Sequence, residues 1–259
     1  MSMVGELKYF LGLQVAQDGD GTRVHQQKYV REILKKFGME SAKTCATPMS
    51  PNDSLAKYES SLQVDPTLYR GMIGSLLYLT ASRPDILFSV CLCAIFQADP
   101  RETHVKAVKR ILRYLKGTDD MCLFYSKGGD LRLMAYTDAD YAGCKTDIKS
   151  MSGMAQFLGP CLISWGSKKQ SSIALSTAEA EYIVAAACCA QLLWIKQQLS
   201  DYGVHLECIS ILCDNTSAIN ISKNLVQFSH TKHIVIRYHF LRDCVEKGTI
   251  AMEYCRTEE

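Results

Sequence analysis

The sequence of 259 residues lacks three features that would each point to a class of protein. No apolar run approaches the roughly 18 residues that a membrane helix needs. No CxxC pair occurs among the 12 cysteines, which disfavours a zinc site and favours cysteines that act as small core residues. No signal peptide follows the initial methionine, so we expect a reduced, intracellular protein of the cytoplasm or nucleus.

The chain also has little net charge, because 29 Lys and Arg nearly balance 27 Asp and Glu and leave +2. Overall charge therefore gives no reason to expect a nucleic-acid partner, and any such argument depends on where the charges lie. The 47% of hydrophobic and 22% of charged residues are typical of globular proteins. The length is sufficient for two domains, each with its own core.

The first half of the sequence predicts a hairpin followed by helices. The turn signal DGDG at residues 18–21 separates two strand-like runs. A helix is expected over about 27–37, closed by Gly38, and a long surface connection over 46–64. Three further helices are expected where a capping residue comes shortly before a proline, at Asp65-Pro66, Ser82-Arg83-Pro84 and Asp99-Pro100.

The last of these helices, PRETHVKAVKRILRYLKG, has one apolar stripe and one basic stripe. Such a basic stripe either binds phosphates through charge and counterion release or is simply a solvated face. The sequence leaves both alternatives open. The residues of the basic stripe are Lys106, Lys109, Arg110, Arg113 and Lys116.

The second half predicts an α/β domain, with three consecutive strands and then helices and strands in alternation. The change of pattern after Gly117 places the boundary between domains of residues 1–125 and 126–259. Strands are expected at 131–138, 153–159, 161–165, 209–213 and 248–255, and helices at 177–200, 215–222 and 231–246.

Acidic residues fall at the ends or starts of several of these elements. LRLMAYTDADYAG places Asp138 and Asp140 at the end of the first strand, on one strand face, so periodicity does not choose between them. Asp214 follows the strand 209–213, although it would also serve as a helix cap. Glu179 and Glu181 open the long helix 177–200.

A capping box from Ser176 to Glu179 explains Glu179 structurally and leaves Glu181 unexplained. Carboxylates on separate elements, without clustered His or Cys, favour magnesium or manganese over zinc. Two such ions roughly 4 Å apart can activate a water molecule and stabilise the leaving oxygen of a phosphodiester.

Several long motifs are similar to those of a known family. The segments YTDADYAG, SKKQSSIALSTAEAEYIVAAA, CDNTSAINISKN and TKHIVIRYHFLRD resemble, in that order, the ribonuclease H domain of copia-type long-terminal-repeat retrotransposons. Earlier segments resemble the end of the reverse transcriptase of the same polyprotein: GELKYFLGLQV, LYRGMIGSLLYLTASRPDILFSV and HVKAVKRILRYLKGT. The resemblance covers essentially the whole chain.

The resemblance implies a ribonuclease H-like, mixed five-stranded sheet with flanking helices. A mainly helical thumb and connection region of a reverse transcriptase would precede it, with an N-terminal hairpin. Asp138, Glu181 and Asp214 match the family's catalytic, metal-binding acids, and two Mg²⁺ (or Mn²⁺) ions are the implied cofactors. Asp140 is then a neighbouring polar residue.

The implied partners are an RNA–DNA hybrid, or another nucleic acid, and the remainder of a Pol polyprotein, without a membrane. The resemblance favours phosphate binding by the basic stripe. It also suggests phosphate contacts near the ribonuclease site from Lys168, Lys169 and Lys232.

In the family, the polymerase aspartates lie upstream of GELKYFLGLQV, and a fourth acid follows the RTEE segment. We therefore expect this chain to lack polymerase activity and to have an impaired form of two-metal hydrolysis of RNA in RNA–DNA hybrids. One alternative is a catalytically inert nucleic-acid-binding remnant of a decayed element. An unrelated structural α/β protein would require all of these motifs to coincide by chance.

Overall fold

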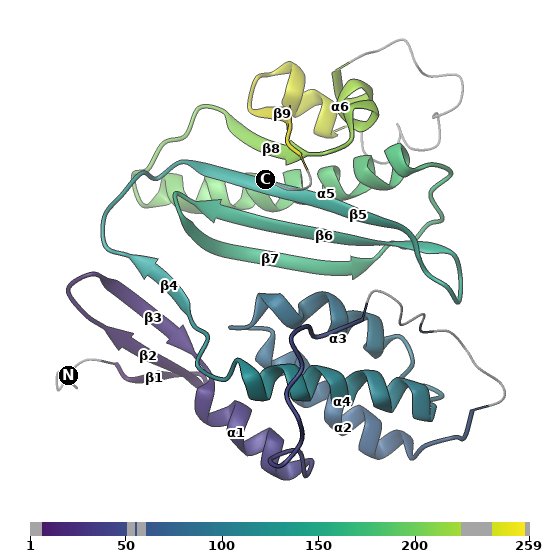
Figure 1. Cartoon of the computed structure of the whole chain (residues 1–259). Helices are drawn as coiled ribbons and strands as arrows, with labels where there is room; N and C mark the ends of the chain where they lie inside the picture. The colour runs from purple at the N-terminus through teal and green to yellow at the C-terminus, as the bar shows by residue number, and fades with distance from the viewer. Residues whose placement is uncertain (1–6, 51–54, 56–60, 224–239, 257–259) are drawn as a thin grey trace. The chain divides into compact units, whose positions relative to one another are not determined.

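A computed structural model of the chain describes residues 7–50, 55, 61–223 and 240–256. The chain divides into two units, Met1–Gly128 and Gly129–Glu259 (Figure 1). Each unit has its own hydrophobic core. The division lies after Gly128 instead of after residue 125, which keeps the last residue of strand β4 with the sheet that it joins.

A small antiparallel sheet opens the first unit, in the order β1-β2-β3-β4. Its strands are β1 (Tyr9–Phe10), β2 (Leu13–Gln17), β3 (Gly21–His25) and β4 (Leu123–Ser126). The predicted hairpin is confirmed, and Asp18 Oδ1 accepts hydrogen bonds from the amides of Asp20 and Gly21 in its turn. A side chain at Gly21 would lie 2.2 Å from the carbonyl oxygen of Tyr125, so β4 approaches only because a glycine is present.

Helices form the rest of the first unit: α1 (Gln27–Lys36), α2 (Pro66–Leu79), a 3₁₀ turn (Pro84–Ile86), α3 (Leu87–Ala94) and α4 (Glu102–Gly117). Their apolar faces pack into one core that contains Ile33, Tyr69 and Ile111. The predicted cap of α2 is confirmed, because the Asp65 side chain accepts a hydrogen bond from the Thr67 amide at 2.8 Å.

Two predicted caps in this unit are wrong. The helix expected to follow Asp99 begins at Glu102 with Arg101 as its N-cap, and the Arg101 amide donates to His104 Nδ1 at 3.0 Å. Asp99 instead binds the Arg101 side chain at 2.8 Å. Ser82 caps nothing, because its hydroxyl donates to Gln26 Oε1 at 2.8 Å, a contact that sequence periodicity does not reveal.

A buried arginine joins the 3₁₀ turn before α3 to the residue that follows α4. Arg83 is 3% exposed and binds the carboxylate of Asp85 at 2.7 and 2.9 Å. It also donates to the carbonyl and the hydroxyl of Thr118, both at 2.7 Å. Burial opposes ionisation of Asp85, but the hydrogen bonds and charge of Arg83 outweigh it and hold the pKa of Asp85 below its ordinary value.

The second unit contains the predicted mixed five-stranded sheet, in the order β7-β6-β5-β8-β9. The first three strands form antiparallel hairpins, whereas β5, β8 and β9 run parallel. The strands are β5 (Leu133–Cys144), β6 (Lys149–Leu158), β7 (Cys161–Lys169), β8 (Ile209–Cys213) and β9 (Ile250–Tyr254). The α/β class is therefore confirmed for this unit.

Helix α5 (Thr177–Asp201) packs its buried residues against this sheet, together with α6 (Thr216–Lys223) and the helical residues 240–246. Residues 224–239, which include the start of the helix expected over 231–246, lie outside the described residues. The buried face of the sheet meets α5 through residues such as Ala135, Ile211 and Leu192.

The expectation that no segment is long and apolar enough to cross a membrane needs correction. Helix α5 passes that test, since the mean hydropathy of its most apolar window is 1.3, although 67% of that window is buried inside the protein. The core helix of a folded unit passes the same test by composition. Burial against the sheet accounts for its apolar character here.

Candidate active site

Asp138 lies inside β5 and not at the end of it, as the sequence had suggested. The strand continues to Cys144 and pairs with β6, where Asp138 faces Gly153. The parallel pairing of β5 with β8, in contrast, ends one residue before Asp138, at the pair Thr137 and Cys213. Asp138 and Asp214 are thus the first residues beyond the paired segments of two neighbouring parallel strands, at the edge where α/β sheets commonly bind ligands.

Glu181 reaches these strand ends from the start of α5. Its Oε1 accepts a hydrogen bond from the Ala139 amide at 2.9 Å, and its Oε2 lies 3.9 Å from the Cys213 sulfur, which donates to it. One carboxylate therefore joins α5 to both β5 and β8. Glu181 is 5% exposed, whereas Asp138 is exposed and Asp214 half-buried, so the group of acids is open to solvent on one side.

The start of α5 is fixed by the predicted cap. Ser176 accepts a hydrogen bond from the Glu179 amide at 3.2 Å, and Glu179 Oε2 accepts one from the Leu175 amide at 2.7 Å. The reciprocal bond thus reaches one residue further back than in the usual capping box. Gln170 ties the same turn to the sheet, because its side-chain amide donates to the Ala180 carbonyl and to Ser152.

The acids act on one another electrostatically. Burial, and then the charges of Asp138 and Asp214, raise the pKa of Glu181 to about 7 against the opposing hydrogen bond from Ala139. Burial and the charges of Asp214 and Asp140 likewise raise the pKa of Asp138. Within the described part of the chain, neither Glu181 nor Asp138 forms an ion pair with a lysine or arginine.

Sequence reasoning missed Cys213, having found no clustered cysteine or histidine. Ligand atoms of Glu181, Cys213 and Asp214 all lie within 4.8 Å of one another. The thiol is 1% exposed, and burial raises its pKa to about 11. Only the adjacency of Cys213 to Asp214 in the sequence could have indicated it.

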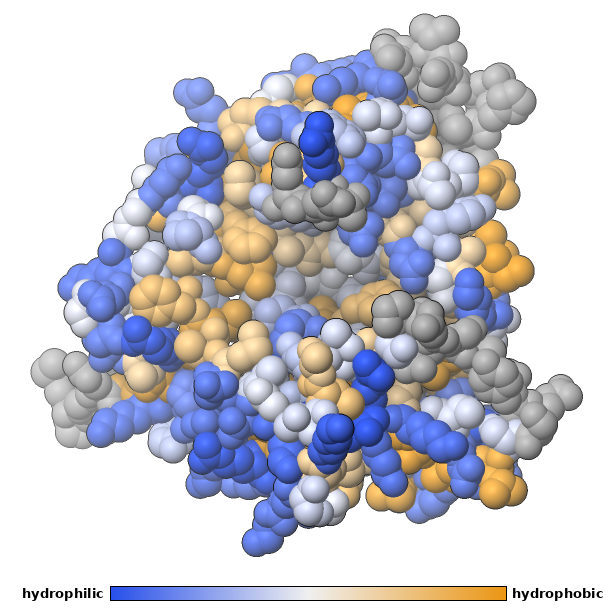
Figure 2. Space-filling view, viewed as in Figure 1, coloured by the Kyte–Doolittle hydropathy of each residue, from blue (hydrophilic) through white to orange (hydrophobic). Residues whose placement is uncertain are grey.

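Some residues of the basic stripe of α4 are exposed, whereas others hydrogen-bond to the segment that follows α1. Lys106 and Lys109 are exposed, and hydrophilic side chains stand out over α4 in Figure 2. Arg110 donates to the carbonyl and hydroxyl of Thr47, and Lys116 donates to the Ala42 carbonyl at 2.8 Å. Arg110 and Lys116 therefore hold the segment that follows α1, a structural role that the sequence did not predict.

The lysines expected near the ribonuclease site differ in the same way. Lys168 on β7 is exposed, whereas Lys169 is half-buried and pairs with Asp147 at 2.9 Å. Lys232 lies outside the described residues.

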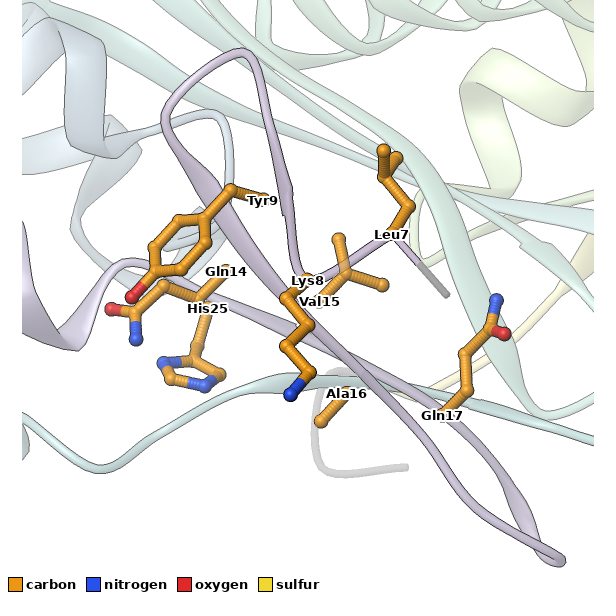
Figure 3. A pocket seen from close by; sticks show the side chains of 8 residues that line it. All are labelled: Leu7, Lys8, Tyr9, Gln14, Val15, Ala16, Gln17 and His25. Carbon is orange, nitrogen blue, oxygen red and sulfur yellow. The ribbon is translucent and has the colours of Figure 1, made fainter. Parts of the chain in front are cut away.

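A separate pocket of about 350 Å³ lies on the hairpin of the first unit. Figure 3 shows the side chains of Tyr9, Gln14 and His25 grouped together, with Gln17 further along the same strands. Its lining is mixed polar and aliphatic and contains no acidic residue, so it does not resemble the site around Glu181.

Comparison with known proteins decides which family these features represent. The Pol polyprotein of transposon RE1 from Arabidopsis thaliana is 40% identical over 98% of this chain. A family model described as reverse transcriptase (RNA-dependent DNA polymerase) matches residues 1–51. The chain belongs to the Pol polyproteins of copia-type retrotransposons. It spans 17% of the length of the RE1 polyprotein.

Two further comparisons concern a shorter relative and a solved structure. An uncharacterized mitochondrial protein of Arabidopsis thaliana is 36% identical over 75% of this chain, which covers 80% of that relative. The structure of a foamy viral protease-reverse transcriptase, solved with double-stranded DNA, matches 96% of this chain and 37% of that one, with 10% identity and a TM-score of 0.56. The residues that match the reverse transcriptase model lie in the first unit, and the mixed five-stranded sheet forms the second.

Proposed function

We propose that the second unit hydrolyses the RNA strand of RNA–DNA hybrids, with Asp138, Glu181 and Asp214 as the metal-binding acids. The observation that carries this proposal is the convergence of these three acids from separate elements at one sheet edge, where Glu181 is buried among like charges. A buried carboxylate among other acids is costly unless a cation neutralises it. The site therefore suits a bound divalent ion.

The donor set fits Mg²⁺ or Mn²⁺, because carboxylate oxygens are the ligands that these ions prefer. When bound, two such ions supply an activated water and stabilise the departing 3′ oxygen. The chain itself fixes the position of Glu181 through the Ala139 amide. Asp138 is the exposed acid of the three and would hold the ion on the side of the site that is open to solvent.

Cleavage of a labelled hybrid in Mg²⁺ or Mn²⁺ tests this proposal. We expect the wild-type chain to cut the RNA strand and Asp138→Asn to lose at least about a hundredfold in rate, since such ligands act as a unit. Asp140→Asn is the matched control and should retain most of the rate. Equal rates for wild type and Asp138→Asn would exclude the assignment.

We also propose that Lys106 and Lys109 contact nucleic-acid phosphates, because they are the exposed cations of the α4 stripe. The foamy viral match, solved with double-stranded DNA, supports a nucleic-acid partner for this fold. Replacing both lysines by Gln should weaken hybrid binding and reduce its salt dependence. The matched control replaces Lys35 and Lys36, which are exposed at the end of α1.

These two measurements separate the enzyme from an inert remnant. Hybrid binding that depends on Lys106 and Lys109, without cleavage by correctly folded protein, would support the catalytically inert alternative. If the Lys106/Lys109 and Lys35/Lys36 variants bind alike, the α4 stripe is not the contact surface.

A further inference from the structure

We infer that Glu181, Cys213 and Asp214 form a binding site for a single thiophilic divalent ion, Zn²⁺. This site has a different ligand set from the proposed magnesium site, because it includes a sulfur atom and does not require Asp138. The inference goes beyond the proposed function and does not depend on whether the chain cuts RNA.

The geometry brings the three ligand atoms close to the separations that one zinc ion requires. All three lie within 4.8 Å of one another, and Cys213 Sγ lies 3.9 Å from Glu181 Oε2. Zinc bonds of about 2.3 Å to sulfur and about 2.0 Å to oxygen place tetrahedral ligand atoms roughly 3.5 Å apart. Small side-chain rotations are therefore enough to enclose the ion, with water as the remaining ligand.

The surroundings of Cys213 hold its sulfur in place. The Asn215 amide donates to Sγ at 3.4 Å, and the thiol has two acceptors at 3.9 Å, Glu181 Oε2 and the Asn215 carbonyl. Zinc binding would replace the thiol proton: a zinc–sulfur bond forms, the sulfur–hydrogen bond breaks, and one proton passes to water. The amide hydrogen bond then stabilises the negative charge on sulfur.

The chemistry of the ligands selects the ion. A thiolate ligand favours zinc or cadmium, whereas magnesium prefers sites made of oxygen atoms. Because Glu181 and Asp214 belong to both ligand sets, a bound zinc ion would withdraw two acids from the magnesium site. We therefore expect Zn²⁺ to compete with Mg²⁺ and Mn²⁺.

The absence of a CxxC pair argued only against sites in which both sulfurs come from one short segment. At Cys213 a single thiol meets carboxylates from α5 and from the residue that follows β8. Cys188 offers a matched control in the same unit, because it is fully buried and its thiol contacts the side-chain amide of Gln156 at 3.4 Å.

Metal binding to the whole chain tests the inference. The exposed Cys122 and Cys208 are first replaced by Ser, to reduce binding elsewhere. In this background, Cd²⁺ should produce a sulfur-to-metal charge-transfer band, and Zn²⁺ affinity is measured against a chromophoric chelator. Cys213→Ser should lose the part of the charge-transfer band that comes from Cys213 and should release one proton fewer on binding the ion. It should also bind Zn²⁺ at least about tenfold more weakly.

Cys188→Ser should change none of these signals. These signals are measured without RNA, so a failure of the proposed hydrolysis would leave this result intact. If Cys213→Ser retains the band and the affinity, the inference is wrong. Glu181→Gln keeps the thiol and should also weaken Zn²⁺ binding, so it provides the test if Cys213→Ser does not fold; an unchanged affinity there would equally overturn the inference.

Discussion

Each unit buries a charged side chain almost completely, but the two charges are treated in opposite ways. Arg83 in the first unit is 3% exposed and has Asp85 and Thr118 as partners. Glu181 in the second unit is 5% exposed and is raised in pKa by burial and by other acids. A compensated buried charge fixes a structure, whereas an uncompensated one is a candidate for binding or chemistry.

The difference is visible in the pKa values of the carboxylates concerned. Arg83 holds the pKa of Asp85 below its ordinary value, whereas burial and neighbouring charge raise that of Glu181 to about 7. Removing the charge of Arg83 should therefore destabilise the first unit, whereas removing the charge of Glu181 should stabilise the second unit. Both tryptophans, Trp165 and Trp194, lie in the second unit, so their fluorescence reports its unfolding and far-UV circular dichroism includes the first unit.

The largest expected effect follows removal of the buried cation. Arg83→Met leaves Asp85 and the Thr118 carbonyl without their donor and should destabilise the first unit by about 3–5 kcal/mol. Urea unfolding followed by circular dichroism should show an early transition, with the tryptophan transition unchanged. Combining the change with Asp85→Asn should recover part of the loss. If the Arg83→Met chain keeps the wild-type unfolding transition, Arg83 does not stabilise the first unit.

Removal of the buried acid should have the opposite effect when metal is absent. Glu181→Gln keeps an acceptor for the Ala139 amide and removes a charge whose pKa is raised from 4.5 to about 7. In chelator at pH 8, we expect it to stabilise the second unit by roughly 3 kcal/mol, at about 1.4 kcal/mol per pKa unit. Mg²⁺ should stabilise the wild type but not the variant. Destabilisation by Glu181→Gln would show that the acid has a structural role.

The pH dependence of the two units should also differ. Because the folded pKa of Glu181 lies above its unfolded value, the second unit should lose roughly 2 kcal/mol of stability as pH rises from 5 to 8 without metal. Asp85 has a lowered pKa, so its contribution persists above pH 3.8 and is lost only as pH falls through its folded value. Urea unfolding at both pH values measures this, and Glu181→Gln should remove most of the slope.

The smallest expected effect concerns the helix caps. Ser176→Ala and Asp65→Ala each remove one side-chain cap and should cost about 1 kcal/mol in their respective units. Ser176→Ala should in addition raise the Mg²⁺ concentration needed to stabilise the second unit, because α5 positions Glu181. Titration of thermal unfolding with Mg²⁺ compares them. An equal Mg²⁺ response in both variants would show that the Ser176 cap does not affect metal binding at Glu181.

Local signals in the sequence predicted the elements well where the determining residues are close together. The turn at Asp18, the cap at Asp65 and the cap at Ser176 each depend on residues within a few positions. Strand β4 was missed because it is short and its partner β3 lies about a hundred residues earlier. The contacts of Arg110 with Thr47 were missed for the same reason.

By itself, the sequence determined the α/β pattern and the family motifs, because periodicity and motif spacing are local properties of the chain. The resemblance carried by those motifs predicted Asp138, Glu181 and Asp214 as the metal-binding acids. Only the tertiary structure decided that Glu181 is buried, that Asp138 lies within a strand, and that Cys213 stands among the acids. Burial and electrostatic coupling depend on segments that meet after folding. For this reason the raised pKa values of the acids could be found only from the tertiary structure, while the acids themselves could be proposed from the sequence.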